Sequence, residues 1–217
     1  MDVFDASNLE ELESFAYRPH QLAILKRDQP AGADAFFHKL QKKSFGLAGD
    51  VTRITAYDDL HYILEEDMPA TLQHEAFYEC WLNDMSRIAA LFCEVEKSDA
   101  IRVWIGSQRG CSRYHIDNVP QRLLVTYAGK GTEWLPDEAA DRAAFVNGEP
   151  NERIVKDMSA RQFIDEWDVA IFRGGSKGLL HRTPDEALHG HSILMRLDNW
   201  RFGSNKFKPH RHAEHTA

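Results

Sequence analysis

The sequence predicts an α+β protein with a double-stranded β-helix (jelly-roll) core and N-terminal helices packed on its sheet. Two features indicate this fold class. A long amphipathic helix pattern follows Pro69, and short apolar runs separated by glycine-containing turns fill the chain from Ile101 onward. Many short strands with such turns are typical of a sandwich or jelly-roll barrel. We expect one domain over residues 1–203, comprising a mixed α/β part (1–97) and the jelly-roll core (98–203).

The mixed N-terminal part contains three weaker patterns. Residues 21–26 (QLAILK) are apolar enough for a strand, which the turn-forming residues 28–32 would end. Asp34 can cap a helix that runs to about residue 43, because a short polar side chain there accepts a hydrogen bond from the first helical turn. Residues 51–56 alternate weakly, as expected for an exposed strand.

The strongest helix pattern follows Pro69. Its large apolar residues recur at spacings of three and four, which places them on one stripe of a helix: Phe77, Trp81, Met85, Ile88, Phe92 and Val95. This stripe predicts a helix lying on a sheet, and a cofactor-binding or partner-binding groove is the alternative. Cys80 and Cys93 fall in the same helix, where we expect them to be small buried residues.

Short strands are expected throughout the second half of the chain. Their predicted ranges are 101–105, 114–118, 123–127, 132–135, 168–172, 178–181 and 191–197. Residues 136–147 read as a helical insertion between two of them. The polar tail 204–217 carries His210, His212 and His215 and is expected to be disordered, with metal scavenging as its alternative role.

The composition excludes several classes of protein. The net charge of -8 over 217 residues argues against a general nucleic-acid or anionic-membrane binder. The acidic start of the chain lacks the apolar run of a secretory signal, and no stretch approaches the roughly 20 apolar residues that span a bilayer. Three cysteines without CxxC spacing fit a reducing compartment, so we expect a cytoplasmic protein without membrane association. The oligomeric state is left open.

Three residues predict a metal site. In a strand, residues two apart point to the same face, so His115 and Asp117 can converge on one ion. His181 follows a buried strand pattern and a glycine turn. Two imidazoles and one carboxylate can occupy one face of an iron and leave other positions open. Arg196, fifteen positions after His181, can hold a cosubstrate carboxylate bidentately.

Other histidines compete for the same role. His189 or His191 could replace His181 as the distal ligand. Arg196 lies five residues after His191 and could not share its strand face, which favours His181. Each residue also has a purely structural interpretation: Arg196, for example, could pair with Asp198 or Asp168.

The order His115-x-Asp117, His181, Arg196 resembles the non-haem iron(II), 2-oxoglutarate-dependent dioxygenases, and the gap of fifteen resembles the taurine-dioxygenase-like branch. The resemblance implies that His115, Asp117 and His181 are the iron ligands and catalytic residues, and that Arg196 binds the far carboxylate of 2-oxoglutarate. Thr132, which follows Gly131 as in the superfamily's Gly-Thr pair, is a further cosubstrate contact.

The resemblance also suggests supporting residues. Tyr127 is a candidate for the cofactor side of the site, and Asn118 and Arg122 are candidates for orienting the ligands. His191 remains the alternative ligand. The whole chain also resembles a bacterial family of unknown function, which implies no activity.

The resulting hypothesis is an iron(II)- and 2-oxoglutarate-dependent oxygenase that hydroxylates an unknown small molecule or protein side chain. The alternative is a non-redox zinc-binding or zinc-handling protein on the same barrel, with Cys111, His191 or the tail histidines completing a tetrahedral site. A third possibility is an interaction module with a degenerate site. No GxSxG elbow, P-loop or GxGxxG motif points to other chemistry.

Overall fold

A seven-stranded sheet forms the centre of the protein in the computed structural model, which describes residues 3–42, 44–65, 68–176, 178–189 and 192–201. Only β1 and β2 pair in parallel; the other neighbours in this sheet are antiparallel. The order across the sheet is β1 (Val3–Ala6), β2 (Leu22–Leu25), β8 (Val169–Arg173), β5 (Gln121–Ala128), β10 (Ile193–Asn199), β4 (Ala100–Gly106) and β3 (Gly46–Thr52).

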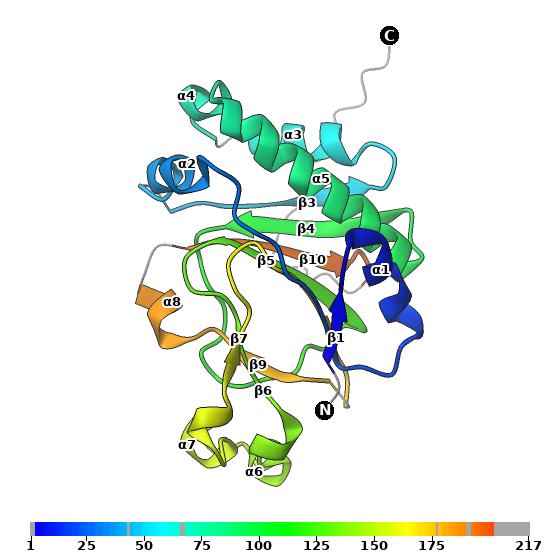
Figure 1. The fold of residues 1–217 in the computed structure, drawn as a ribbon, viewed down its shortest axis with the longest axis vertical. Helices are drawn as coiled ribbons and strands as arrows, with labels where there is room; N and C mark the ends of the chain where they lie inside the picture. Colours follow the sequence, from blue (N-terminus) through cyan, green and yellow to red (C-terminus); the bar gives the residue numbers. More distant parts are fainter. Residues whose placement is uncertain (1–2, 43, 66–67, 177, 190–191, 202–217) are drawn as a thin grey trace.

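A smaller sheet lies on one side of the large one and the main helices lie on the other (Figure 1). The small sheet has the order β7 (Gln162–Phe163), β6 (Glu133–Leu135) and β9 (Leu180–Arg182). The N-terminal half supplies the helices: α1 (Leu9–Glu13), the 3-10 turn η1 (Ser14–Tyr17), α2 (Ala33–Leu40), α3 (Ala56–Glu65), α4 (Ala70–Gln73) and α5 (Ala76–Glu96). The expected α+β architecture with helices packed on a sheet is therefore confirmed.

Helix α5 is the long helix predicted from the apolar stripe. Five stripe residues are buried in the main core, and Phe77 packs against it from a partly buried position. Cys93 is buried as expected, but the expectation for Cys80 was wrong because its side chain is exposed. Each residue turns a helix by about 100°, and Cys80 lies one residue before Trp81 on the side away from the sheet.

Strand alternation divides the large sheet into two faces. On β5, Leu123, Val125 and Tyr127 point into the core under the helices. Leu124 belongs to a second apolar cluster shared with residues of the small sheet, such as Trp134. The inner face of the large sheet, between the two sheets, is the face that carries the polar side chains described below.

Some predicted elements differ from those observed. Residues 51–56 were expected to form a strand, but β3 ends at Thr52 and α3 begins at Ala56. Residues 114–118 form no strand; an isolated bridge between His115 and His181 stands there. The tail 204–217 and His191 lie outside the described residues.

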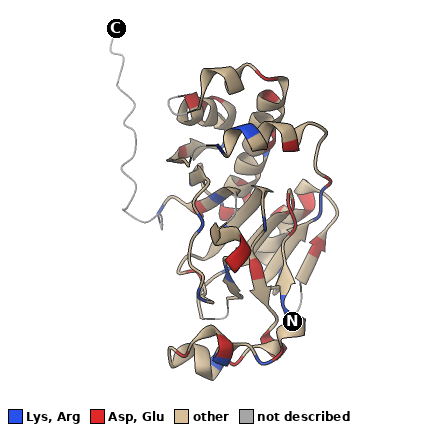
Figure 2. Ribbon diagram, turned by 90° about the vertical axis from the view of Figure 1, so that its left-hand side faces the viewer, with Lys and Arg blue, Asp and Glu red and all other residues tan. Residues whose placement is uncertain are grey.

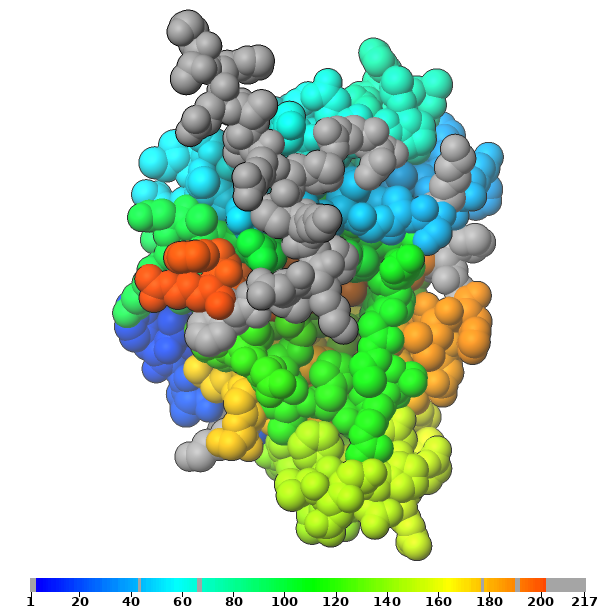
Figure 3. All heavy atoms as spheres, turned by 180° about the vertical axis from the view of Figure 1, so that it is seen from behind, coloured from blue at the N-terminus to red at the C-terminus, as the bar shows by residue number. Residues whose placement is uncertain are grey.

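The helical insertion after β6 is real but longer than predicted. It comprises η2 (Asp137–Ala139), α6 (Arg142–Val146), α7 (Asn151–Ile154) and η3 (Met158–Ala160). Figure 3 shows this insertion at the lower end of the molecule, with α8 (Asp185–His189) to one side. Acidic and basic residues are interspersed along the ribbon (Figure 2). No helix in the described ranges is long and apolar enough to cross a membrane.

Candidate metal centre

The three predicted ligands converge at the edge between the two sheets. His115 and His181 face each other through a pair of backbone hydrogen bonds, from His115 N to His181 O at 3.0 Å and from His181 N to His115 O at 3.1 Å. Asp117 follows two residues after His115. One ligand atom from each of the three residues lies within 4.8 Å of the others. No other group of three potential ligands gathers within the part of the chain that the structure describes.

Hydrogen bonds fix the orientation of both imidazoles. Nδ1 of His115 lies 2.9 Å from the Arg113 carbonyl oxygen, and Nδ1 of His181 lies 3.0 Å from the Leu179 carbonyl oxygen. A carbonyl only accepts, so each Nδ1 must donate its hydrogen. In the neutral ring this leaves Nε2 as an unprotonated lone pair, which is the form that binds a metal ion.

The two Nε2 atoms point toward the Asp117 carboxylate. Nε2 of His115 lies 3.9 Å from Oδ1, and Nε2 of His181 lies 3.3 Å from Oδ2. Oδ2 is buried and has no hydrogen-bond partner among the described residues. Two acceptors that face each other at this distance repel unless a proton or a metal cation lies between them. The donor set therefore fits a divalent metal ion.

The charge states of the ligands agree with this fit. Burial would raise the pKa of Asp117, but the contact with His181 and the nearby Arg122 outweigh it and lower this pKa to about 2. The pKa of His115 is lowered, mainly by burial and also by the neighbouring His181. At neutral pH the carboxylate is thus charged and the His115 ring is neutral, as metal binding requires.

A chain of ion pairs connects the ligand carboxylate to the large sheet. Arg122 binds Oδ1 of Asp117 through Nη1, and its Nε donates to Asp198 Oδ1 at 2.7 Å. Arg122 and Asp198 stand directly opposite each other on β5 and β10. Asp198 is buried, and its Oδ2 lies 3.1 Å from Nε of Arg196. Asp198 therefore holds two arginines, one beside the ligands and one beside the cavity.

A cavity of about 270 Å³ opens beside the two histidines. Its apolar wall is formed by Trp104, Leu124 and Leu194 from the inner face of the large sheet. The other side chains around it are polar or small: Gln108, Arg109, Gly110, Cys111, His115, Arg122, Thr132, His181, Arg182, Thr183 and Arg196. The cavity has room for a small organic molecule next to a metal held by the three ligands.

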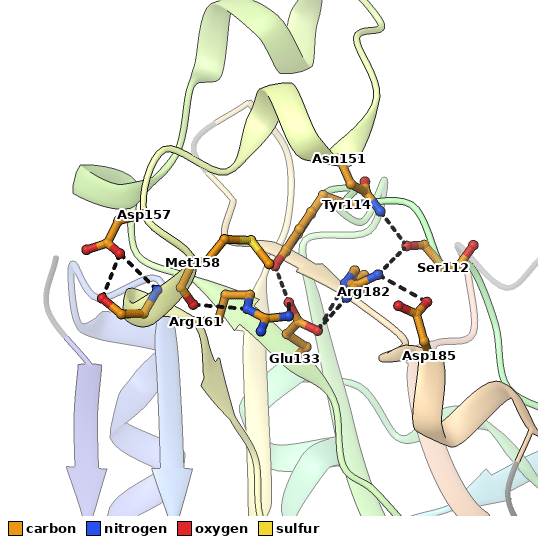
Figure 4. A network of polar contacts seen from close by, with 10 residues as sticks. Ser112, Tyr114, Glu133, Asn151, Asp157, Met158, Arg161, Arg182 and Asp185 are labelled. Carbon is orange, nitrogen blue, oxygen red and sulfur yellow. Dashed lines mark hydrogen bonds and ion pairs between the residues drawn. The ribbon is translucent and has the colours of Figure 1, made fainter.

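A buried network on the small sheet supports the strand that carries His181 (Figure 4). Glu133, fully buried on β6, accepts hydrogen bonds from Arg182 Nε at 3.0 Å and from the Tyr114 hydroxyl. Arg182 Nη2 lies 2.9 Å from the same carboxylate. Arg182 adjoins His181 and Tyr114 adjoins His115, so Glu133 ties together the two backbones that position the imidazoles.

The structure places the other predicted residues as follows. Thr132 and Arg122 line the cavity. Tyr127 does not: its hydroxyl donates to Asp84 at 2.9 Å in the core on the opposite face of the sheet, so we propose no cofactor role for it. Asn118 is exposed and is not among the residues that line the cavity. His191 cannot be assessed because it lies outside the described residues.

Two residues of the site were not expected from the sequence as parts of it. The sequence suggested Asp198 only as a possible structural partner of Arg196. Its contact with Arg122 depends on the pairing of β5 with β10, which the sequence alone does not give. Arg109 lines the cavity from the segment after β4. That segment has no periodicity, so no sequence signal marked it.

Comparison with known proteins identifies the family. The family model described as "Protein of unknown function (DUF1826)" matches residues 6–198, and the chain belongs to this family. A search of curated proteins gives no match.

Solved structures that this chain matches include a full-length Neurospora crassa protein in complex with alpha-KG, with 11% identity, 91% of this chain and 83% of that chain covered, and a TM-score of 0.42. They include the Fe(II)/(alpha)ketoglutarate-dependent dioxygenase TqaL, with 8% identity, 88% and 85% covered, and a TM-score of 0.41. HygX from Streptomyces hygroscopicus with iron bound has 9% identity, 87% and 86% covered, and a TM-score of 0.42. At these identities and TM-scores the chemistry must be argued from the site's own residues.

Proposed function

We propose that this protein is a non-haem iron(II)- and 2-oxoglutarate-dependent oxygenase built on a double-stranded β-helix. The observation that carries the proposal is the arrangement of His115, Asp117 and His181. Both rings have Nδ1 bonded to a backbone carbonyl, and both Nε2 atoms point toward the Asp117 carboxylate. The oxygen that faces His181, Oδ2, is buried and has no hydrogen-bond partner among the described residues. Two imidazoles and one carboxylate beside an open cavity are the donor set of a metal centre that keeps positions free for other ligands.

In this proposal the three side chains hold the iron and the protein orients what binds beside it. The chemistry that such a centre supplies is oxidation of a substrate C–H bond coupled to decarboxylation of 2-oxoglutarate. Arg122 keeps the Asp117 carboxylate charged and fixed. The apolar wall of Trp104 and Leu124 limits the access of water to the reacting groups.

Arg196 is the proposed partner of the far carboxylate of 2-oxoglutarate. Its Nε lies 3.1 Å from Asp198 Oδ2 but has no hydrogen-bond partner among the described residues, and the side chain lines the cavity. A guanidinium end with two donors matches a carboxylate. The hydroxyl of Thr132, buried against the same cavity, is a second proposed contact to the cosubstrate.

The zinc-handling alternative requires a fourth protein ligand, because structural zinc sites are closed and tetrahedral. Cys111 lines the cavity but does not belong to the ligand group, which holds three residues within the described ranges. Three ligands beside an open cavity fit a centre that binds a cosubstrate better than a closed one.

Anaerobic titration of the metal-free protein with iron(II) and then 2-oxoglutarate tests the proposal. We expect a weak visible charge-transfer band from the chelated 2-oxo acid. His115→Ala should abolish it, and Arg196→Ala should weaken 2-oxoglutarate binding by about 10-fold or more through loss of a charge-assisted contact. Arg102→Ala is the matched control, because Arg102 pairs with Asp50 away from the cavity. Bound metal without any band would favour the zinc-handling alternative.

A further inference from the structure

Arg109 lines the cavity and forms no ion pair with a carboxylate of the residues that the structure describes. It lies in the segment between β4 and Tyr114. Its Nη1 donates to Ser192 Oγ at 2.9 Å and reaches Thr126 Oγ1 at 3.4 Å. Its Nε is buried with no hydrogen-bond partner, and no carboxylate oxygen of the described residues forms an ion pair with it. The two hydroxyls therefore orient the side chain but do not neutralise it.

The other arginines of this cavity are all paired. Arg122 contacts Asp117 and Asp198, Arg196 contacts Asp198, and Arg182 contacts Glu133. A largely buried charge without a counter-ion is costly unless a ligand supplies one. Burial lowers the pKa of Arg109 to about 10, which still leaves the guanidinium charged at neutral pH.

Adding the charges of the site with metal and 2-oxoglutarate bound also leaves Arg109 without a counter-charge. Asp117 and Asp198 neutralise Arg122 and Arg196. A divalent metal ion and the dianion 2-oxoglutarate neutralise each other. One positive charge then remains in the cavity, at Arg109, and one negatively charged group of a further ligand would neutralise it.

The guanidinium group of Arg109 has donors that could bind an oxyanion. With Nη1 occupied by the hydroxyls, the buried Nε and Nη2 have no hydrogen-bond partner among the described residues, and the side chain lines the cavity. Arg102 of this same protein uses these two atoms to bind both oxygens of Asp50, at 2.8 and 3.2 Å. We propose that Arg109 forms a second anion-binding subsite, which takes a carboxylate or phosphate group of the substrate. This inference rests on the proposed function and narrows the substrate to an anionic small molecule or side chain.

Anion binding to the metal-loaded protein tests the subsite. The protein carries Mn(II) in place of iron(II) and saturating 2-oxoglutarate, and is titrated with acetate and, separately, with inorganic phosphate by calorimetry and tryptophan fluorescence, since Trp104 lines the cavity. We expect Arg109→Gln to weaken binding of the preferred anion by about 10- to 100-fold, the loss typical of charge-assisted hydrogen bonds, while 2-oxoglutarate still binds. Arg102→Gln is the matched control and should change neither. The anion that binds more tightly distinguishes a carboxylate from a phosphate substrate.

Several outcomes would overturn the inference. The first is equal anion binding in wild type and Arg109→Gln, and the second is no anion binding in wild type. The third is loss of 2-oxoglutarate binding in Arg109→Gln, which would mean that Arg109 binds the cosubstrate. If 2-oxoglutarate binds to no variant, the proposed function fails, and titration of the metal-free protein then tests the subsite alone. If Arg109→Gln does not fold, Arg109→Lys replaces it: the charge stays, the paired donors are lost, and anion binding should still weaken.

Discussion

Replacing Asp198 with Asn should destabilise the protein by about 3 kcal/mol. Asp198 accepts from Arg122 Nε at 2.7 Å and lies 3.1 Å from Arg196 Nε. Its side chain is 5% exposed, whereas those of Arg122 and Arg196 are 18% and 29% exposed. Removing one partner of a buried ion pair costs about 3–5 kcal/mol, because the remaining charge loses its compensation. Arg122 keeps Asp117, and an Asn oxygen can still accept, so the lower end of this range applies.

The matched control is Asp50→Asn. Arg102 contacts Asp50 through the same Nε geometry, at 2.8 Å, but the Asp50 side chain is 45% exposed. An exposed pair contributes at most about 1 kcal/mol. The two substitutions are therefore chemically identical and differ in burial.

Thermal and urea unfolding of the metal-free protein measures both variants. For a domain of this size each 1 kcal/mol lowers Tm by about 2–4 °C, so Asp198→Asn should lower Tm by about 6–12 °C and Asp50→Asn by no more than about 4 °C. Equal, small effects of the two substitutions would refute the reasoning, because they would mean that the buried carboxylate does not hold the two arginines.

Three further predictions concern buried ionisable groups. The pKa of Asp117 is depressed from 3.8 to about 2, so the stability that this carboxylate contributes is present above about pH 4 and lost as the pH falls toward 2; Asp117→Asn should flatten the pH dependence of urea unfolding of the metal-free protein in this window. A thiol reagent should modify Cys80 and Cys111 in the native protein but reach Cys93 only on unfolding, since burial raises the pKa of the Cys93 thiol to about 12. Glu133→Gln should lower the free energy of unfolding by about 3 kcal/mol, measured by urea titration, because it uncouples a buried arginine from its only fully buried carboxylate partner among the described residues.

The elements that sequence predicted well are those whose burial is periodic. The stripe of α5 recurs at three and four residues because one side of the helix packs on the sheet. The strands β4, β5, β8 and β10 were found because their apolar runs are bounded by turns. By contrast, α3 was missed although Ala56, Leu60 and Leu64 recur every four residues and are buried, because the acidic residues between them masked the pattern.

The geometry of the site could not be predicted from local sequence patterns alone. The expectation that His115 and Asp117 converge rested on strand alternation, yet this segment is not a strand, and the backbone bridge to His181 brings the three residues together instead. The alternation of side chains along a strand would have excluded one of two candidate site residues. Arg122 and Tyr127 lie five residues apart on β5, so they cannot share a face of the sheet. Of these two, Arg122 is the one that reaches the cavity.

The surrounding contacts hold the three proposed metal ligands in place without a metal. Asp117 is held charged by Arg122, which Asp198 in turn anchors to the centre of the large sheet, between β5 and β10. The histidines are fixed from the other side by backbone carbonyls and by the Glu133 network. The large sheet thus anchors Asp117 and the small sheet carries His181, and His181 Nε2 and Asp117 Oδ2 face each other at 3.3 Å. A metal cation bound to both atoms would connect these two parts of the site, so metal binding should raise Tm in the wild type and have little effect in His181→Ala.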